Sequence, residues 1–219
     1  GAKWLINNAT RGELLTVLAR TNDGGGLSAL SLVHFDKPAA EGFRCLPKIS
    51  THGIRGADIS GIAFDRAGPA TLLGREGTGA TLALQALQVT RIGCAAFSLG
   101  AGDTALRLAL DFALDRQLYG AAAFEIPHVR AVLTTAFLDL LIAEAVALGA
   151  WRGLHLVPEQ MSLASAVTKY FVPTRVEALI RDVAVVFGAR HWLREGSFQK
   201  VMRDASVVSL FDGSTAVNL

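Results

Sequence analysis

The spacing of hydrophobic residues divides the chain into a first part with short apolar runs and a longer second part with helical periodicity. Residues 4–6, 14–19, 30–35 and 59–64 are short apolar runs, several alternating or β-branched, and they predict β-strands. The run Asn-Asp-Gly-Gly-Gly at 22–26 predicts a hairpin loop between the second and third strands, because glycine tolerates positive φ. We therefore expect a sheet domain over residues 1–73.

From residue 78 onward the hydrophobic period is helical. Residues 78–99 and 103–118 are separated by Gly100 and Gly102, which predicts two helices. A long helix is expected over 127–150, with Pro127 in its first turn. Residues 161–171 and 174–187 come next, and Pro173 between them predicts at least a kink. With a further helical run around residue 203, these segments predict an antiparallel four-helix bundle over 78–219.

The glycine-rich stretch at 73–79 lies where the two patterns meet. Its glycine spacing is neither that of a dinucleotide-binding loop nor that of a P-loop, so it predicts a linker between sheet and helix. The expected fold class is α+β, a partial β-barrel or sheet domain succeeded by the bundle.

The charge and the composition limit the classes of partner that this protein is expected to bind. The net charge is +2, from 21 basic and 19 acidic residues that are intermixed, which gives no argument for nucleic acid or an anionic membrane. Only 18% of residues are charged and 51% are hydrophobic, so much apolar surface must be buried in packed helices and in a subunit interface. The most apolar run, 131–150, contains Asp139 and Glu144, which favours a bundle helix over a membrane span.

The cysteines and histidines predict no metal site. Cys45 and Cys94 lie far apart, without metal-binding or redox spacing, and are interpreted as core thiols of a protein in a reducing, cytoplasmic compartment. The five histidines are scattered and lack ligand spacing. The opening residues lack the pattern of a signal peptide.

The segment 187–215, FGARHWLREGSFQKVMRDASVVSLFDGST, carries the strongest candidate chemistry. Arg203 and Asp204 are adjacent, so on a helix they point to different sides and should pair with different partners. Asp212 is expected where that helix ends, because Gly213 breaks it and Ser214 or Thr215 could cap the next segment. A carboxylate at such a turn is a candidate base, and a simple turn or capping Asp is the alternative.

This segment resembles the C-terminal signature of the acyl-CoA dehydrogenases, in which a glycine pair precedes an Arg-Asp-Ala helix and a Glu-Gly-Thr turn that carries the catalytic base. Here the pair is Gly188-Ala189 and the turn carries Asp212. Further family-like motifs occur in the same order: Gly1-x-Lys3-x-Leu5-Ile6-Asn7-Asn8-Ala9, Gly53-Ile54-Arg55-Gly56-Ala57, Leu73-Gly74-x-x-Gly77-x-Gly79, Arg91, Arg116-x-x-Tyr119-Gly120 and Lys169-Tyr170-Phe171.

The resemblance covers almost the whole chain, but only the second part of the family's middle β-domain and its C-terminal helical domain. The family's N-terminal all-α domain and its flavin-holding Thr-Glu-Pro loop are not in the sequence. The resemblance therefore implies that the N-terminal part is a separate chain, was cleaved away, or was omitted.

The resemblance implies an FAD-dependent oxidoreductase that desaturates an acyl thioester, carried on CoA or on an acyl carrier protein. A carboxylate would remove the α-proton while the β-hydride passes to flavin N5. Asp212 would be the base, Arg91 would support its loop, and Gln88 and Gly213 would contact substrate. The residues implied to contact FAD are Asn7, Arg116, Tyr119, Gly188, Ala189 and Ser214, and Arg116 would reach the cofactor of a neighbouring subunit in a homo- or hetero-oligomer, a dimer or tetramer.

Several positions depart from the family pattern and keep two alternatives open. Asp212 is one methylene shorter than Glu, about 1 Å of reach, and a misplacement of that size can cost about 100-fold in rate. Leu5 replaces an aromatic residue near the flavin, and Pro127 replaces a glutamine that bonds to the cofactor. One alternative is a non-catalytic partner subunit. The other is a flavoenzyme of the nitroalkane-oxidase type, which uses an Asp base on the same fold.

Overall fold

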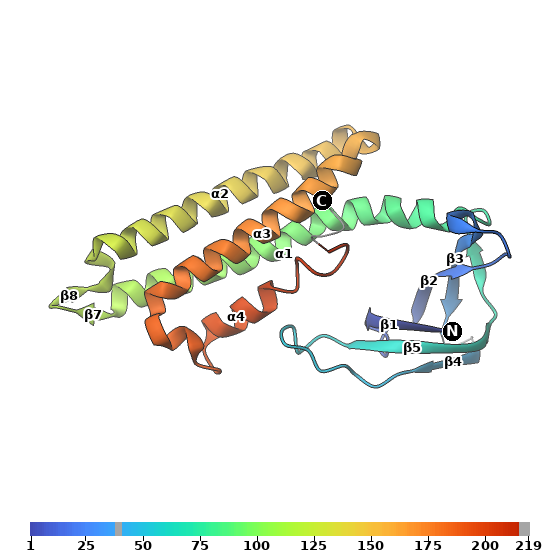
Figure 1. The fold of residues 1–219 in the computed structure, drawn as a ribbon, viewed down its shortest axis with the longest axis horizontal. Coiled ribbons are helices and arrows are strands. Elements are labelled where there is room, and N and C mark those ends of the chain that lie inside the picture. Colours follow the sequence, from blue (N-terminus) through green and yellow to red (C-terminus); the bar gives the residue numbers. More distant parts are fainter. Residues whose placement is uncertain (38–40, 215–219) are drawn as a thin grey trace. The chain divides into compact units, whose positions relative to one another are not determined.

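A computed structural model describes residues 1–37 and 41–214. The chain forms two compact units, Gly1–Leu87 and Gln88–Leu219. The first unit contains the long strands and the second contains the helical bundle, as Figure 1 shows. This α+β architecture confirms the predicted fold class.

The first unit holds two small antiparallel sheets. One has the order β1 (Ala2–Asn7), β5 (Ile59–Gly68), β4 (Glu41–Cys45), and the other has the order β2 (Leu14–Arg20), β3 (Leu30–Asp36), β6 (Thr71–Leu73). Four of these strands, β1, β2, β3 and β5, confirm the predicted apolar runs. The sequence analysis missed β4 and β6, because β4 has only one partly buried side chain and β6 is three residues long.

The predicted hairpin joins β2 to β3. The two strands pair without a register shift from Leu14 opposite Asp36 to Arg20 opposite Leu30, and the short 3-10 helix η1 (Gly26–Ala29) completes the loop. Successive side chains of these strands point to opposite faces of the sheet. Leu15 and Phe35 therefore lie on the buried face, in a core that also contains Ala9 and Ile62.

The linker at 73–79 packs on the start of β3. The Gly77 amide donates to the hydroxyl of the buried Ser31 at 2.9 Å. A Cβ on Gly79 would lie 2.4 Å from the Ser31 carbonyl carbon, so only glycine allows this approach. The segment connects β6 to α1 (Gly79–Asp115), which confirms its interpretation as a sheet-to-helix linker.

The predicted division of residues 78–118 and of residues 161–187 into two helices each is wrong. Helix α1 runs without interruption through Gly100 and Gly102, and α3 (Met161–Phe187) runs through Pro173. An interior glycine costs a helix only about 1 kcal/mol relative to alanine, which packing can offset. A Cβ on Gly102 would lie 3.0 Å from Leu140 Cδ1, so this glycine lies in a tightly packed part of the core.

The helices of the second unit are most of α1, which begins in the first unit, α2 (Pro127–Leu156), α3 and the short α4 (Ser197–Ala205). A hairpin of β7 (Gln117–Leu118) and β8 (Ala121–Ala122) and the 3-10 helix η2 (Ala123–Glu125) connect α1 to α2. Two more 3-10 helices, η3 (Pro158–Gln160) and η4 (Gly188–Trp192), flank α3. Helices α1, α2 and α3 lie side by side in Figure 1 around a core rich in alanine, leucine and valine.

Helix α4 confirms one detail of the C-terminal prediction and corrects another. Arg203 donates to Gln199 and Asp204 pairs with Lys200 at 2.7 Å, so the two neighbours do have different partners. The helix ends at Ala205, however, seven residues before Asp212. The segment between them is a series of turns, so the expectation that the helix ends at Asp212 is wrong.

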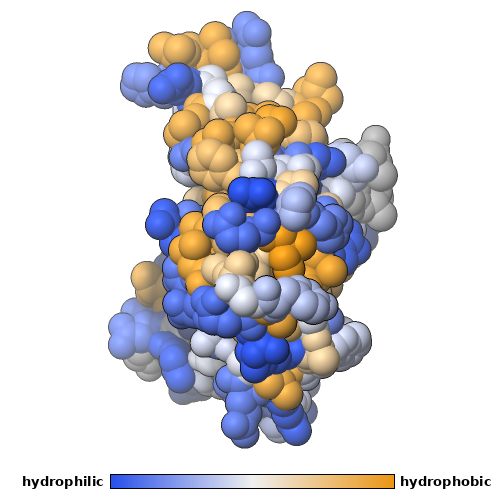
Figure 2. Space-filling model, turned by 90° about the vertical axis from the view of Figure 1, so that its left-hand side faces the viewer, coloured by the Kyte–Doolittle hydropathy of each residue, from blue (hydrophilic) through white to orange (hydrophobic). Residues whose placement is uncertain are grey.

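Large apolar side chains remain exposed on the long helices. On α2 they are Phe137, Leu138, Leu141, Ile142, Leu148 and Trp151. Figure 2 shows broad hydrophobic areas on the face that it presents. By length and composition α1 and α2 could each cross a membrane, and only 22% and 28% of their most apolar windows are buried. The core of the bundle therefore does not use all of their apolar surface.

Candidate functional site

The candidate base lies in the turn segment that comes after α4. The Val208 amide donates to the Ala205 carbonyl at 3.0 Å, and the Phe211 amide donates to the Val207 carbonyl at 3.2 Å. Asp212 and Gly213 have φ of 56° and 94°, two successive residues in the left-handed region. A non-glycine residue adopts this conformation only at a cost of about 1–3 kcal/mol, which tertiary contacts must offset.

Helix α1 supplies two contacts to Asp212. Arg91 Nε donates to the Asp212 backbone carbonyl at 3.4 Å, and Cys94 Sγ donates to Asp212 Oδ2 at 3.5 Å. The two α1 residues are three apart and therefore share one face of the helix. Burial, and then the nearby Asp212 carboxylate, raise the pKa of the Cys94 thiol to about 12, so the thiol stays protonated and keeps its donor.

Helix α3 supplies a buried cation to the same segment. Lys169 has only 1% of its surface exposed, and its ammonium donates to the Val208 carbonyl at 2.5 Å and to the Gly213 carbonyl at 3.2 Å. The ammonium also lies 5.6 Å from the centroid of the Phe211 ring. Burial lowers the pKa of Lys169, while the charges of Asp212 and Glu177 oppose that shift.

The other candidate substrate residues belong to this end of the helical unit. Gln88 lies three residues before Arg91 on α1 and is half-buried. Gly213 contributes its carbonyl to Lys169, and the next residue, Ser214, is half-buried. Thr215, named above as a possible cap, lies outside the described residues. The structure thus brings Gln88, Arg91, Asp212, Gly213 and Ser214 to the region where α1 meets the C-terminal turn.

Four candidate cofactor residues lie at the opposite end of the helical unit, where α1 leads into the β7–β8 hairpin seen in Figure 1 and where α3 ends. Arg116 directly succeeds α1, and Tyr119, 98% exposed, lies in the hairpin turn with φ of 56°. Gly188 and Ala189 come directly after α3, and both are exposed. The ends of α1 and α3 touch, because the rings of Phe112 and Phe187 lie 5.0 Å apart.

This end has the chemistry to hold an anion. Arg116 is exposed, and the guanidinium of Arg190 lies 5.3 Å from the centroid of the Phe112 ring, one turn before Arg116. A Cβ on Gly188 would meet no atom within 4 Å, so the backbone there is open to a ligand. Glu125, a possible partner of Arg116, lies 3.5 Å from Arg130 instead. Guanidinium groups bind phosphate oxygens in bidentate fashion, so these residues fit a diphosphate.

The residues around Asp212 and the residues around Arg116 and Gly188 are far apart within one chain. From Cys94 to the end of α1 is 21 residues, or about 30 Å at the rise of an α-helix. The candidate residue Asn7 belongs to the first unit, where it pairs with Ile59 in the β1–β5 ladder. The ten candidates therefore do not form one site within the helical unit.

Sequence reasoning missed Cys94 and Lys169 as neighbours of the candidate base. Cys94 carried one signal, its spacing of three residues from Arg91. Lys169 carried another, since it is the sole charged residue in the apolar stretch 161–172. A lone charge on an apolar helix face indicates a buried polar contact, but it does not identify the partner.

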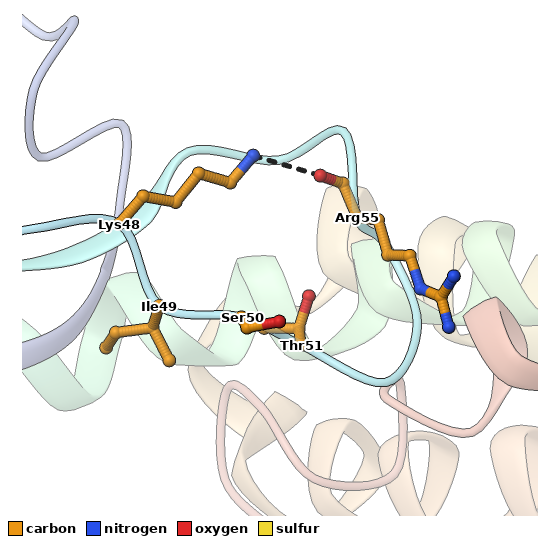
Figure 3. Close-up of a pocket in the computed structure, with 5 residues that line it drawn as sticks. All are labelled: Lys48, Ile49, Ser50, Thr51 and Arg55. Carbon is orange, nitrogen blue, oxygen red and sulfur yellow. Dashed lines mark hydrogen bonds between the residues drawn. The ribbon is translucent and has the colours of Figure 1, made fainter.

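The first unit contains a small basic pocket of about 300 Å³, lined by Lys48, Ile49, Ser50, Thr51 and Arg55. In Figure 3 the Lys48 ammonium points to the Arg55 backbone carbonyl, a hydrogen bond of 2.9 Å. The Arg55 guanidinium extends away from Lys48, and its Nε donates to the His52 carbonyl at 3.2 Å. The two cations therefore do not converge on a common ligand. Across residues 1–37 and 41–214, no three or more His, Cys, Asp or Glu side chains are grouped to hold a metal.

Comparison with known proteins identifies the family. The model of the acyl-CoA dehydrogenase C-terminal domain matches residues 77–219. The probable acyl-CoA dehydrogenase fadE25 of Mycobacterium leprae is 27% identical over 225 residues, which cover 99% of this chain and 56% of that protein. The chain thus spans about half the length of the relatives it matches.

Solved structures share the fold of the whole chain. Butyryl-CoA dehydrogenase from Megasphaera elsdenii superposes with a TM-score of 0.94 at 22% identity, covering 100% of this chain and 57% of that one. An acyl-CoA dehydrogenase from Bacillus anthracis complexed with FAD superposes with a TM-score of 0.88 at 18% identity, covering 100% of this chain and 40% of that one. Since the family model matches well over half of the residues, this chain belongs to the acyl-CoA dehydrogenase family.

Proposed function

We propose that this chain is the base-bearing part of an FAD-dependent oxidoreductase that desaturates an acyl thioester between its α and β carbons. Membership of a flavoprotein family supports the reaction class. The observation that carries the proposal is the Asp212 turn, in which a carboxylate projects from a backbone held by Arg91 and Lys169. The thioester would be carried on CoA or on an acyl carrier protein.

Asp212 would act as a general base on the α-carbon. Such a base needs a fixed position, because proton transfer requires hydrogen-bonding distance to the proton that it removes. An aspartate is shorter than a glutamate, so its reach depends on where the backbone places it. The contacts of Arg91 and Lys169 are made to backbone carbonyls, and they fix that placement.

Arg116 and Gly188 would hold the diphosphate of FAD, with Arg190 as a second cation and Tyr119 and Ala189 beside them. When bound, the flavin supplies the two-electron acceptor of the oxidation. The distance of about 30 Å along α1 argues that the base and the diphosphate group of one chain serve different cofactor molecules. We therefore propose a homo- or hetero-oligomer in which one subunit supplies Arg116 to the cofactor beside the partner's base.

A second candidate function is that of a partner subunit without a catalytic base. One observation favours it: Asp212 Oδ2 accepts a hydrogen bond from the Cys94 thiol of α1. In that case Asp212 would be a structural turn residue, stabilised by Cys94. An oxidase acting on nitroalkanes, with the same base, is the third candidate for an aspartate at this position.

The test replaces Asp212 with asparagine in the protein purified from its source with any polypeptide that accompanies it. We expect wild type to bind flavin that an acyl-CoA bleaches without oxygen. The D212N variant should keep its flavin and lose about 10²- to 10⁴-fold in the bleaching rate, which is the usual contribution of a general base.

The matched control is Asp103→Asn, an exposed α1 carboxylate that pairs with Arg107 of the same helix. It should bleach at the wild-type rate. A protein that takes up no FAD would support the partner-subunit function. Oxygen uptake with a nitroalkane, in place of bleaching by acyl-CoA, would support the oxidase.

A further inference from the structure

The environment of Lys169 identifies a feature that the family comparison does not. Removing an ammonium group from water is expensive unless hydrogen bonds replace its hydration. Lys169 is 1% exposed, and its ammonium donates to two backbone carbonyls. Burying a lysine here therefore stabilises one particular backbone conformation of the C-terminal turn.

The two carbonyls lie on either side of the candidate base. Val208 and Gly213 are five residues apart in sequence, and the segment between them contains Phe211 and Asp212. The ammonium also lies over the Phe211 ring, at a distance typical of a cation–π contact. One side chain thus bridges both ends of the loop from which the carboxylate projects.

The loop needs such a bridge because its backbone is strained. Asp212 has φ of 56°, which non-glycine residues adopt only when their surroundings enforce it. Arg91 contacts the carbonyl of Asp212 from α1, while Lys169 contacts the neighbouring carbonyls from α3. The charged groups that face Lys169 are Arg91 on α1, Asp212 in the turn and Glu177 on its own helix, and the neutral Cys94 thiol lies beside them.

From this geometry we infer that Lys169 is a positioning residue for the Asp212 base, acting by holding the Val208 and Gly213 carbonyls. The inference rests on the proposed function, since Asp212 must be the base. Lys169 does not touch the substrate in this role. Lys169 fixes the position of the backbone that carries Asp212, and the Cys94 thiol of α1 orients the Asp212 carboxylate.

The test compares Lys169→Met with Lys200→Met in the complete flavin-loaded protein. Methionine keeps most of the bulk of lysine and removes its charge and donors. Lys200 is an exposed lysine on α4 that pairs with Asp204, so it controls for the loss of one lysine near the same segment. Three quantities are measured: kcat and KM for an acyl-CoA, the kinetic isotope effect of α-deuterated substrate, and amide hydrogen exchange over residues 206–214.

If Lys169 positions the base, K169M lowers kcat by about 10- to 100-fold, the range expected for a displacement of up to about 1 Å. KM should change less than about three-fold, and the α-deuterium isotope effect should rise because proton removal becomes slower. Exchange over 206–214 should accelerate. K200M should match wild type in all three. A merely structural lysine would change stability and exchange without raising the isotope effect, and that result would overturn the inference.

The second variant, for the case in which K169M does not fold, is Lys169→Arg. Arginine keeps the positive charge but has a larger, planar head group that does not fit the same two carbonyls. We expect K169R to fold, bind flavin and show the same reduced kcat and raised isotope effect. Wild-type kcat in K169R, or in a folded K169M, would overturn the inference.

Failure of the proposed function is separable from failure of the inference. A wild-type protein without activity on any acyl thioester would overturn the proposed function, and with it a positioning role in that reaction. Hydrogen exchange would still decide whether Lys169 holds the segment. Unchanged amide exchange over residues 206–214 in K169M would show that Lys169 does not hold this segment, and would overturn the inference whatever the activity.

Discussion

Asp212 and Asp58 show how two aspartates of one chain acquire different tasks from their neighbours. Asp58 is buried in the first unit, where its Oδ2 accepts hydrogen bonds from the Thr10 amide at 2.9 Å, the Thr10 hydroxyl at 2.6 Å and the Arg11 amide at 3.2 Å. Asp212 has a thiol as its side-chain donor. A carboxylate that accepts several strong hydrogen bonds is stabilised in its charged form, so the neighbours of Asp58 give it a structural task.

A pH-dependent stability is expected for Asp58. The hydrogen bond from the Thr10 side chain, with help from the Thr10 and Arg11 amides, lowers the pKa of Asp58 below its ordinary value. Because the folded-state pKa is the lower one, the stabilisation is complete above the unfolded-state pKa of about 4. It is lost as the pH falls through the folded-state pKa.

We expect Asp58→Asn to unfold at a lower urea concentration than wild type at pH 7, because an amide accepts these bonds less strongly and brings its own donors. The gap between the two midpoints should narrow as the pH falls below the unfolded-state pKa of about 4 and on through the lower folded-state pKa. A gap that stays constant with pH would show that the Asp58 charge contributes nothing to stability. The exposed Asp23→Asn, in the β2–β3 loop, is the control.

At the scale of elements, α1 shows that packing decides what a glycine does in a helix. Gly100 and Gly102 lie two residues apart and therefore face different surroundings. A Cβ on Gly100 would meet nothing within 4 Å. A Cβ on Gly102 would meet Leu140 and Val176, at 3.0 Å and 3.1 Å, where α1 faces α2 and α3.

The two alanine variants should therefore differ in stability. Gly100→Ala should raise the free energy of unfolding by about 0.5–1 kcal/mol, because alanine restricts the unfolded chain and favours the helix. Gly102→Ala has the same gain in helix propensity, but its methyl group must displace two core side chains. Its free energy of unfolding should therefore rise less than that of Gly100→Ala, or fall. Chemical denaturation of both variants measures the difference. A Gly102→Ala gain equal to that of Gly100→Ala would contradict the close packing.

At the scale of the whole molecule, the exposed apolar side chains of α2 remain to be covered. They lie on a protein that carries only 18% charged residues, and an exposed apolar face of this kind marks an interface. The separation of Arg116 from Asp212 gives an independent reason to expect a second copy, because each proposed site would take Asp212 from one copy and Arg116 from the other. Both arguments favour an oligomer over a membrane-bound monomer.

We expect light scattering to give a dimer or tetramer, and Ile142→Lys to shift the protein toward smaller species with loss of flavin. Ile142 is 52% exposed, and burying a side chain of its size contributes about 1.5–3 kcal/mol, which a buried lysine would reverse. Glu159→Lys, in η3 just beyond α2, is the control and should leave the assembly unchanged. A monomeric wild-type protein that retains flavin would contradict the expectation.

The order of strands and helices could be predicted because it depends on local patterns. Alternating apolar runs identified β1, β2, β3 and β5, and the helical period identified the bundle. The predicted separation of two helices at Gly100 and Gly102, and of two more on either side of Pro173, failed for a common reason. Local propensity costs only a few kcal/mol, and burial along α1 and α3 outweighs it.

The sequence by itself determined the fold class and the presence of a carboxylate at a glycine turn, because both are properties of neighbouring residues. Tertiary structure alone decided what surrounds that carboxylate. Arg91 and Cys94 lie 121 and 118 residues from Asp212, and Lys169 lies 44 residues from Gly213, so only the packing of α1 and α3 brings them to the turn. Tertiary structure also placed Arg116 and Gly188 at the far end of the bundle, because a helix of 37 residues keeps its two ends apart.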